Sequence, residues 1–154
     1  MRKFVVILLL FIVMKGFCPE TTFRTIKVKK YSETDLLVKA IGYVESRHCL
    51  TAINPKEGAH GFLQIRKCVV TDVNRAFETS YKVTDALDSI AAVDIFYKYQ
   101  AIYNRKFDLE KAARIWNGGP IGYKKSKTKK YWGAVFRKYV EYKKHNTQLI
   151  IVRK

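Results

Sequence analysis

Apolar residues recur at intervals of three and four positions after residue 35, which is the spacing of one face of an α-helix. The positions that share this face are Leu36, Leu37, Ala40, Ile41 and Val44. Ser32, followed three residues later by Asp35, matches the capping pattern found at the start of helices. The spacing therefore predicts an amphipathic helix over residues 35–49.

The same reasoning divides the rest of the chain into helices and loops. Asn54-Pro55 and Gly58 disfavour a helix, so residues 51–61 are predicted to form a loop that leads into a short apolar segment at 61–65. Asn117-Gly118-Gly119-Pro120 marks the end of a short helix. Helices are predicted over residues 68–77, 85–104, 109–116 and 130–144. Without a repeat or a second domain in the sequence, we predict one mainly α domain.

The first 18 residues have the layout of a secretion signal. Arg2 and Lys3 precede an apolar run at residues 4–14, which is too short to cross a bilayer as a helix. The cleavage site is weakly marked, because charged and bulky residues stand where signal peptides have small ones. Two interpretations stay open, a cleaved signal or an N-terminal anchor that is retained through residues 4–14.

The chain is strongly basic, with a formal net charge of +17 over 154 residues. Such a surface attracts polyanions such as nucleic acid, anionic lipid or the acidic polymers of a cell envelope. Predicted export favours a periplasmic or cell-envelope location. The segment Lys124–Lys130, with five lysines, would support nucleic-acid binding. Lysine runs are more often solvated loops, so nucleic acid is not the expected partner.

The cysteines leave two interpretations open. If Cys18 is removed with the signal, Cys49 and Cys68 remain, either as a disulfide in an oxidising compartment or as two separate buried thiols. His48 projects from the apolar face of the first predicted helix and is expected to pack in the core. The spacing of these residues and His60 does not match a zinc site, so neither a metal nor a cofactor is predicted.

Glu45 has the most distinctive position among the carboxyl groups. At about 100° per residue it falls between Ile41 and Val38, at the margin of the apolar stripe. Partial desolvation there raises the pKa of a carboxyl and favours its neutral form. A group that is protonated near neutral pH can donate a proton to a leaving oxygen. Periodicity alone favours a simpler role, that of a surface charge or a salt-bridge partner.

Four motifs stand in the order in which they occur in the lytic transglycosylase (SLT-type) domain, which is related to goose-type lysozymes. The first is Glu45-Ser46, and the second is Gly58–Ile65, which follows Asn54-Pro55. The third, Ala112–Pro120, resembles the Ala-Tyr-Asn-Ala-Gly motif of that family, and the fourth is Lys130-Tyr131 ahead of a spaced valine. The sequence therefore resembles this family over most of its length.

The resemblance implies a lysozyme-like (SLT/goose-type) helical domain with a substrate cleft over residues 35–144. A basic arm at residues 19–34 and a tail at residues 145–154 flank this domain. The implied reaction cleaves the β-1,4 bond between N-acetylmuramic acid and N-acetylglucosamine in peptidoglycan. The muramoyl 6-hydroxyl attacks its own anomeric carbon, assisted by the N-acetyl group, and a 1,6-anhydromuramoyl end forms. Glu45 would serve first as acid and then as base.

The resemblance also implies roles for five further residues around the substrate. Ser46 would lie near the sugar, and Gln64 would bind the glycan or brace its loop by satisfying backbone groups. Asn117 would hold the acetamido region or the loop backbone, and Tyr131 would orient the catalytic carboxyl. Trp116 stands where the family has a tyrosine, so it offers a larger plane for stacking on a sugar but no hydroxyl group.

Two other functions stay open at this point. A second well-placed carboxylate in the cleft would favour a goose-type lysozyme-like hydrolase. Glu57 is the nearest candidate, but it occupies a loop position where the family tolerates several residues. A non-catalytic basic module would bind envelope polymers or nucleic acid. Small members of the family often serve secretion, conjugation or phage machines, so such a machine is a candidate partner beside peptidoglycan.

Overall fold

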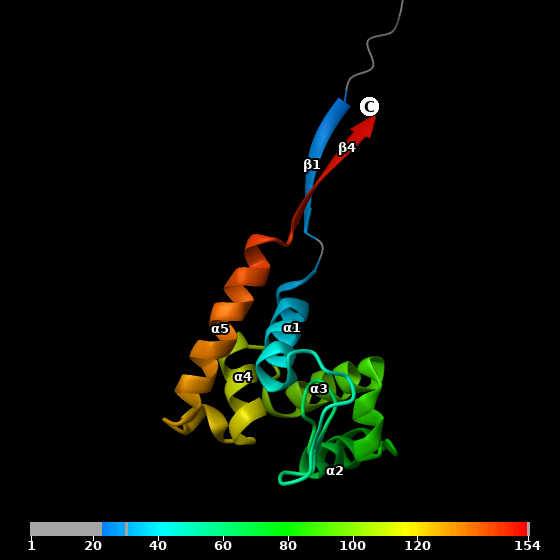
Figure 1. Cartoon of the computed structure of the whole chain (residues 1–154), viewed down its shortest axis with the longest axis vertical. Helices are drawn as coiled ribbons and strands as arrows, with labels where there is room; N and C mark the ends of the chain where they lie inside the picture. The colour runs from blue at the N-terminus through cyan, green and yellow to red at the C-terminus, as the bar shows by residue number, and fades with distance from the viewer. Residues whose placement is uncertain (1–22, 30, 154) are drawn as a thin grey trace, which may run out of the picture.

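The computed structural model describes residues 23–29 and 31–153, and this part of the chain is mainly helical, as predicted. The predicted signal or anchor at residues 1–18, with its apolar run at 4–14, lies outside the described residues. Among the described helices, none combines the length and the apolar character that a bilayer crossing requires. The α-helices are α1 (Glu33–Ser46), α2 (Lys67–Phe77), α3 (Ser89–Tyr103), α4 (Leu109–Gly118) and α5 (Thr128–Lys144), with short 3-10 helices η1 (Val83–Leu87) and η2 (Gly122–Lys124) between them (Figure 1).

Helix α1 is packed between the other helices and supplies much of the core. The predicted face is confirmed, since Leu37, Ala40 and Ile41 have no exposed surface. Ser32 caps the helix, because its Oγ accepts a hydrogen bond from the Asp35 amide at 3.1 Å. Helix α5 lies beside α1 (Figure 1). The side chains that complete the centre of the core come from all five helices and from the segment before α2, and include Leu63, Ile65, Val73, Ile95, Phe96, Ile115 and Val135.

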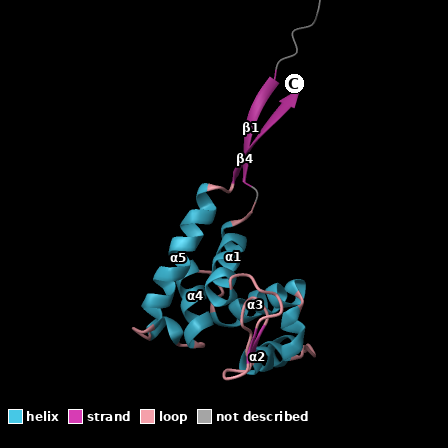
Figure 2. Cartoon of the chain, viewed as in Figure 1, coloured by secondary structure: helices cyan, strands magenta, loops and turns pink. Residues whose placement is uncertain are grey.

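The predicted arm and tail pair with each other. Strand β1 (Phe23–Lys29) runs antiparallel to β4 (Thr147–Arg153), with Lys29 opposite Thr147 at the base of this ribbon. The ribbon extends from the end of the helical body where α1 begins and α5 ends (Figure 2). Asn146 joins the two chain segments at the base of the ribbon, because its side chain exchanges hydrogen bonds of 2.7 and 2.8 Å with the backbone of Tyr31.

Helix α1 ends three residues earlier than predicted. Arg47 takes a left-handed conformation with φ of 57° and caps the helix, and His48 follows with φ of 64°. His48 therefore lies outside the helix and is exposed, and its Nε2 is 3.0 Å from the Tyr142 hydroxyl. The prediction that His48 packs in the core is wrong, because it extended the helical period beyond the point where the helix ends.

The helix predicted over residues 85–104 is divided at Asp88. The Asp88 carboxylate accepts hydrogen bonds from the backbone N–H groups of Ile90 and Ala91 at 2.9 and 2.8 Å. A side chain that binds these amides starts a new helix, so η1 ends before Asp88 and α3 begins after it. Helix α5 begins at Thr128, two residues before the predicted start.

Candidate functional site

A groove of about 680 Å³ opens between α1, the loop that carries strands β2 (Ile53–Asn54) and β3 (Ala59–His60), and the end of α4. Its volume falls within the range of ligand sites, which is about 300–1,000 Å³. Four of the predicted site residues line it, namely Glu45, Gln64, Trp116 and Asn117. Segments that are far apart in the sequence therefore meet around one hollow.

Glu45 lies in the last turn of α1 and is half-buried at the wall of the groove. Burial raises the pKa of its carboxyl above the ordinary value, because the charged form loses hydration. The hydrogen bond from Tyr131 and the positive charge of Arg66 lower this pKa again, but burial is the largest influence and the pKa stays raised. Glu45 is thus an acid that holds its proton to a higher pH than a surface glutamate.

Tyr131 is the direct partner of Glu45. Its hydroxyl donates to Glu45 Oε1 at 2.6 Å, across 86 positions of sequence. The contact exists because Tyr131 lies in the first turn of α5, beside the last turn of α1. Burial and the neighbouring Glu45 carboxylate raise the pKa of Tyr131 well above its usual range, so the phenol remains a donor. The predicted contact between this tyrosine and the carboxyl is present in the structure.

Gln64 lines the groove and also braces the loop beside it. It has a left-handed backbone with φ of 52°, and its Nε2 donates to the carbonyl groups of Gly61 and Ala52 at 2.9 and 3.4 Å. His60 and Ile65 exchange two backbone hydrogen bonds of 2.8 and 2.9 Å, which close the turn that contains Gln64. The bracing role, one of the two alternatives for this residue, therefore matches the observed contacts.

Trp116 is almost fully buried, with 4% of its surface exposed. Its indole N–H donates to the Leu63 carbonyl at 3.0 Å, and its ring packs against Phe96 with 4.9 Å between centroids. These contacts fix the short segment 61–65 against α4. They leave little of the indole for stacking on a sugar, so the observed contacts are those of a structural support at the base of the groove. Asn117, one residue later, is exposed and lines the groove.

Ser46 is not among the described residues that line the groove. Its hydroxyl donates to the Phe62 carbonyl at 2.9 Å and so links the end of α1 to the second motif. Ser46 is therefore placed to hold the loop rather than to contact a ligand in this groove.

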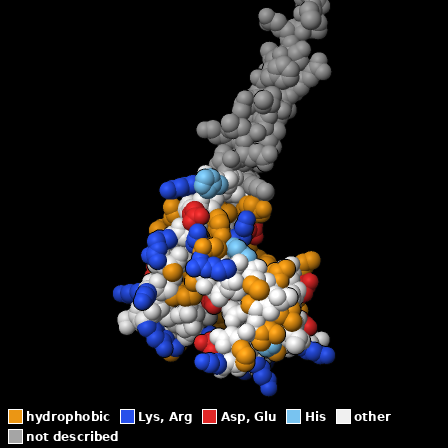
Figure 3. Space-filling view, in the orientation of Figure 1, with side chains coloured by type: hydrophobic (Ala, Val, Ile, Leu, Met, Phe, Trp, Pro, Cys, Tyr) orange, Lys and Arg blue, Asp and Glu red, His pale blue; other side chains and the backbone are white. Residues whose placement is uncertain are grey.

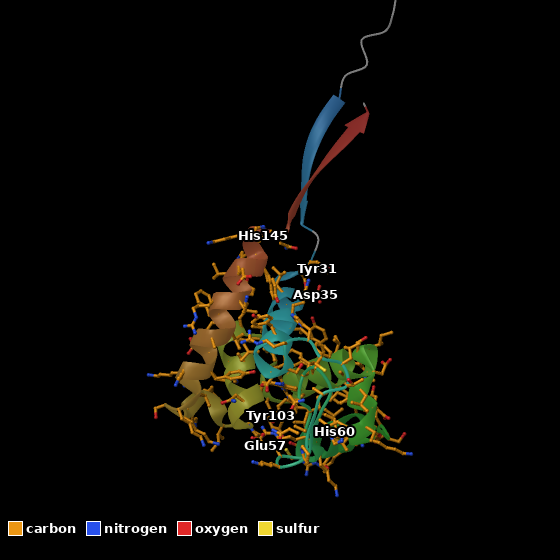
Figure 4. All side chains as sticks on the ribbon, viewed as in Figure 1. Tyr31, Asp35, Glu57, His60, Tyr103 and His145 are labelled. Atoms are coloured by element: carbon orange, nitrogen blue, oxygen red, sulfur yellow. The ribbon has the colours of Figure 1, made fainter. Side chains whose placement is uncertain are left out.

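Charged residues that the motifs did not point to also line the groove. Glu57, labelled on the β2–β3 loop in Figure 4, lies with its carboxylate 3.9 Å from Arg66. Both side chains are accessible, with exposed fractions of 61% and 36%. Lys125 and Lys127 line the groove as well, from the loop after α4. The sequence position of Arg66 could have indicated its place at the groove, since it directly follows the second motif.

The cysteines match neither interpretation drawn from the sequence. Cys49 and Cys68 are both unpaired and both exposed, so they form no disulfide and are not buried. Cys68 lines the groove from the start of α2. Within residues 23–29 and 31–153, no three side chains of His, Cys, Asp or Glu are grouped closely enough to hold a metal ion.

No protein-family model and no curated protein matches this sequence. A carboxyl with a raised pKa, a phenol donor on one of its oxygens and a groove of ligand size are together suited to proton transfer onto a bound substrate.

Proposed function

We propose that this protein is a peptidoglycan lytic transglycosylase with a lysozyme-like (SLT/goose-type) domain. The observation that carries the proposal is that residues of all four motifs lie at or beside one groove. Glu45 of the first motif is hydrogen-bonded by Tyr131 of the fourth, and Gln64 and Asn117 of the second and third line the same groove. The hydrogen bond between Tyr131 and Glu45 supports a catalytic role most directly, because it binds the carboxyl that borders the groove.

The chemistry assigned to Glu45 follows from its hydrogen bond. Because Oε1 accepts the Tyr131 hydroxyl, the acidic proton belongs on Oε2. In the first half of the reaction this proton passes to the glycosidic oxygen as the bond to the muramoyl anomeric carbon breaks. In the second half the Glu45 carboxylate takes the proton of the muramoyl 6-hydroxyl while that oxygen bonds to the anomeric carbon. The two transfers restore Glu45 without water.

The proposed setting is the cell envelope, with the segment at residues 1–18 as a secretion signal or an anchor. Peptidoglycan is the proposed partner, and a secretion, conjugation or phage machine would be the context in which a small enzyme of this kind acts. The basic composition supports this setting, because envelope polymers are acidic. Figure 3 displays Lys and Arg side chains along the α5 edge of the body.

A second function, hydrolysis by a goose-type lysozyme-like reaction, is favoured by one observation. The Glu57 carboxylate lines the same groove as Glu45. A second carboxylate could activate a water molecule for attack on the anomeric carbon, as in glycosidases that use a carboxylate pair. The products distinguish the two reactions, because hydrolysis leaves reducing ends and transglycosylation leaves 1,6-anhydro ends.

Digestion of purified sacculi, followed by mass spectrometry of the soluble fragments, is expected to yield 1,6-anhydromuramoyl ends. Glu57→Gln is expected to keep this product and at least about a third of the rate, because Glu57 takes no proton in the proposed reaction. Reducing ends that disappear in Glu57→Gln would establish the hydrolase instead. Binding to sacculi with no cleavage at all would leave only the non-catalytic basic module.

Tyr131→Phe is expected to shift the pH–rate profile. Loss of the phenol removes a hydrogen bond that lowers the pKa of Glu45, so this pKa rises further and the alkaline limb moves to higher pH. The Glu45 carboxylate formed in mid-reaction also loses a donor, which lowers the maximal rate about tenfold. Initial rates of sacculus cleavage, measured for both proteins from acid to alkaline pH, would give the shift of the alkaline limb and the change in maximal rate.

Tyr139→Phe is the matched control for this experiment. Tyr139 lies on the same helix, and its hydroxyl is 3.4 Å from Lys143 Nζ rather than near Glu45. Its substitution is expected to leave the profile unchanged. Equal shifts in the two variants would argue against a specific influence of Tyr131 on the carboxyl.

A further inference from the structure

The charges that line the groove do not cancel. Glu57 is paired with Arg66, and Glu45 carries no charge while it holds its proton. The ammonium groups of Lys125 and Lys127, which also line the groove, then remain. Neither lysine forms a salt bridge with any residue in the described part of the chain. The lining of the groove therefore has a net positive charge when Glu45 is protonated.

Lys125 is held in place by its surroundings. Its Nζ donates to the Gly118 carbonyl at 2.7 Å, which places the ammonium group at the end of α4. Its backbone carbonyl accepts from Arg114 Nη2 at 3.2 Å and from the Thr128 hydroxyl at 2.8 Å. An ammonium group has three N–H donors, so Lys125 retains two for another acceptor.

The loop that carries both lysines is anchored from beneath by Arg114. This side chain is largely buried, with 8% of the residue exposed. Its Nε donates to the hydroxyl of the fully buried Thr128 at 3.0 Å, and its Nη1 pairs with Glu110 at 2.7 Å. A loop fixed in this way loses little conformational freedom when a ligand binds, and this preorganisation favours affinity.

We propose that Lys125 and Lys127 form a subsite of the groove for carboxylate groups of the peptide side chains attached to muramic acid. This inference rests on the proposed function and specifies the substrate of the same site as glycan whose peptides are present and negatively charged. Carboxylates suit the subsite because charge-assisted hydrogen bonds to ammonium groups are among the stronger ones. The peptide is attached to the muramoyl residue on which Glu45 acts, so it enters the groove with the scissile bond.

Phosphodiester polymers attached to the glycan are the other source of anions on the same substrate. They are linked at a few places along a strand, whereas every uncleaved muramoyl peptide brings carboxylates to the groove. Peptide carboxylates are therefore the source that a subsite in the same groove as Glu45 would meet at each turnover.

The test measures binding of the full-length Glu45→Gln protein to sacculi by co-sedimentation at about 0.15 M salt, where long-range attraction is screened. The sacculi are used in three forms, untreated, treated with carbodiimide and ammonia to convert carboxylates into neutral amides, and treated with hydrofluoric acid to remove phosphodiester polymers. Amidation is expected to weaken binding about fivefold, and hydrofluoric acid is expected to change it less than about twofold. Loss of binding after hydrofluoric acid alone would overturn the assignment to carboxylates.

Lys127→Gln identifies the residue, with Lys124→Gln as the matched control. Lys124 belongs to the same lysine segment and is exposed, but it is not among the described residues that line the groove. Lys127→Gln is expected to weaken binding to untreated sacculi about fivefold and to leave binding to amidated sacculi unchanged. Lys124→Gln is expected to weaken both less than about twofold. Equal losses in the two variants would overturn the subsite.

These outcomes are independent of the catalytic proposal. If the otherwise wild-type protein cleaves sacculi while both lysine variants bind alike, the subsite is wrong and the enzyme stands. If no cleavage occurs while Lys127→Gln alone loses binding to carboxylated sacculi, the reaction is wrong and the anion subsite stands.

Discussion

Glu45→Gln is expected to lower the rate of peptidoglycan cleavage about a thousandfold, the middle of the range for loss of a general acid. Glutamine has nearly the same shape and can still accept the Tyr131 hydrogen bond at its amide oxygen, but it cannot release a proton. The fall should appear in the turnover rate rather than in binding to sacculi. Release of soluble muropeptides, measured by chromatography at several substrate concentrations, separates these two quantities.

The same variant is expected to be more stable than the wild type at neutral pH. Because burial raises the pKa of Glu45, the folded protein holds this proton more tightly than the unfolded chain does. The neutral side chain therefore contributes stability that is complete below the unfolded-state pKa and is lost as the pH rises through the folded-state pKa. Glutamine stays neutral throughout. Thermal unfolding should give a higher Tm for Glu45→Gln at pH 7 and similar values for the two proteins below about pH 4.

The cleavage rate and the Tm of Glu45→Gln together distinguish loss of the acid from damage to the fold. An inactive variant with a lowered Tm at pH 7 would mean that the substitution damaged the fold. A folded variant with full activity would exclude Glu45 as the acid and leave the groove without its proposed chemistry.

Gly61→Ala is expected to destabilise the folded protein by about 3 kcal/mol or more. Gly61 has φ of 73°, a left-handed conformation, and a Cβ atom at this position would lie 1.8 Å from the Ala86 carbonyl oxygen. That oxygen belongs to the backbone of η1, so relief requires the loop and η1 to move apart. Strain at such a position and a backbone clash each cost on the order of 1–3 kcal/mol. Chemical denaturation of both proteins would measure the difference in the free energy of unfolding.

Gly58→Ala separates the two causes. Gly58 also has a left-handed backbone, with φ of 59°, but a Cβ atom there would meet nothing within 4 Å. It is expected to cost only the conformational penalty of about 1–2 kcal/mol. Similar losses at the two glycines would show that the close approach of the segment 61–65 to η1 is not tight in solution. Gly61→Ala should also lower activity, because Gln64 is braced on the Gly61 carbonyl.

Local patterns in the sequence were sufficient to predict several features. The three- and four-residue spacing identified the buried face of α1, and the Ser32–Asp35 pair identified its start. The break at Asp88 was missed because the apolar period continues across it, and only the side-chain capping of two amides reveals a new helix. Such a side-chain contact with the backbone offers an alternative to continuing the helix, and the spacing of apolar residues does not reveal it.

Local sequence patterns could not predict the contacts between distant parts of the chain. The pairing of β1 with β4 depends on α1 and α5 bringing the two strands to the same end of the body. Likewise, the sequence does not distinguish the two neighbouring lysines. Lys125 donates a hydrogen bond to the end of α4 and lines the groove, whereas Lys124 is not among the described residues that line it. Trp116 shows why a motif position alone did not predict sugar stacking. Its indole N–H donates to the Leu63 carbonyl and its ring packs against Phe96.

The bond between Tyr131 and Glu45 has a consequence for biosynthesis. A ribosome adds Glu45 early and the phenol that orients it 86 residues later, so a growing polypeptide carries the acid long before it carries the partner. A nascent chain, or one truncated ahead of α5, would contain the first motif without the phenol that binds its carboxyl. The proposed lytic activity would thus reach its full rate only after α5 has been synthesised.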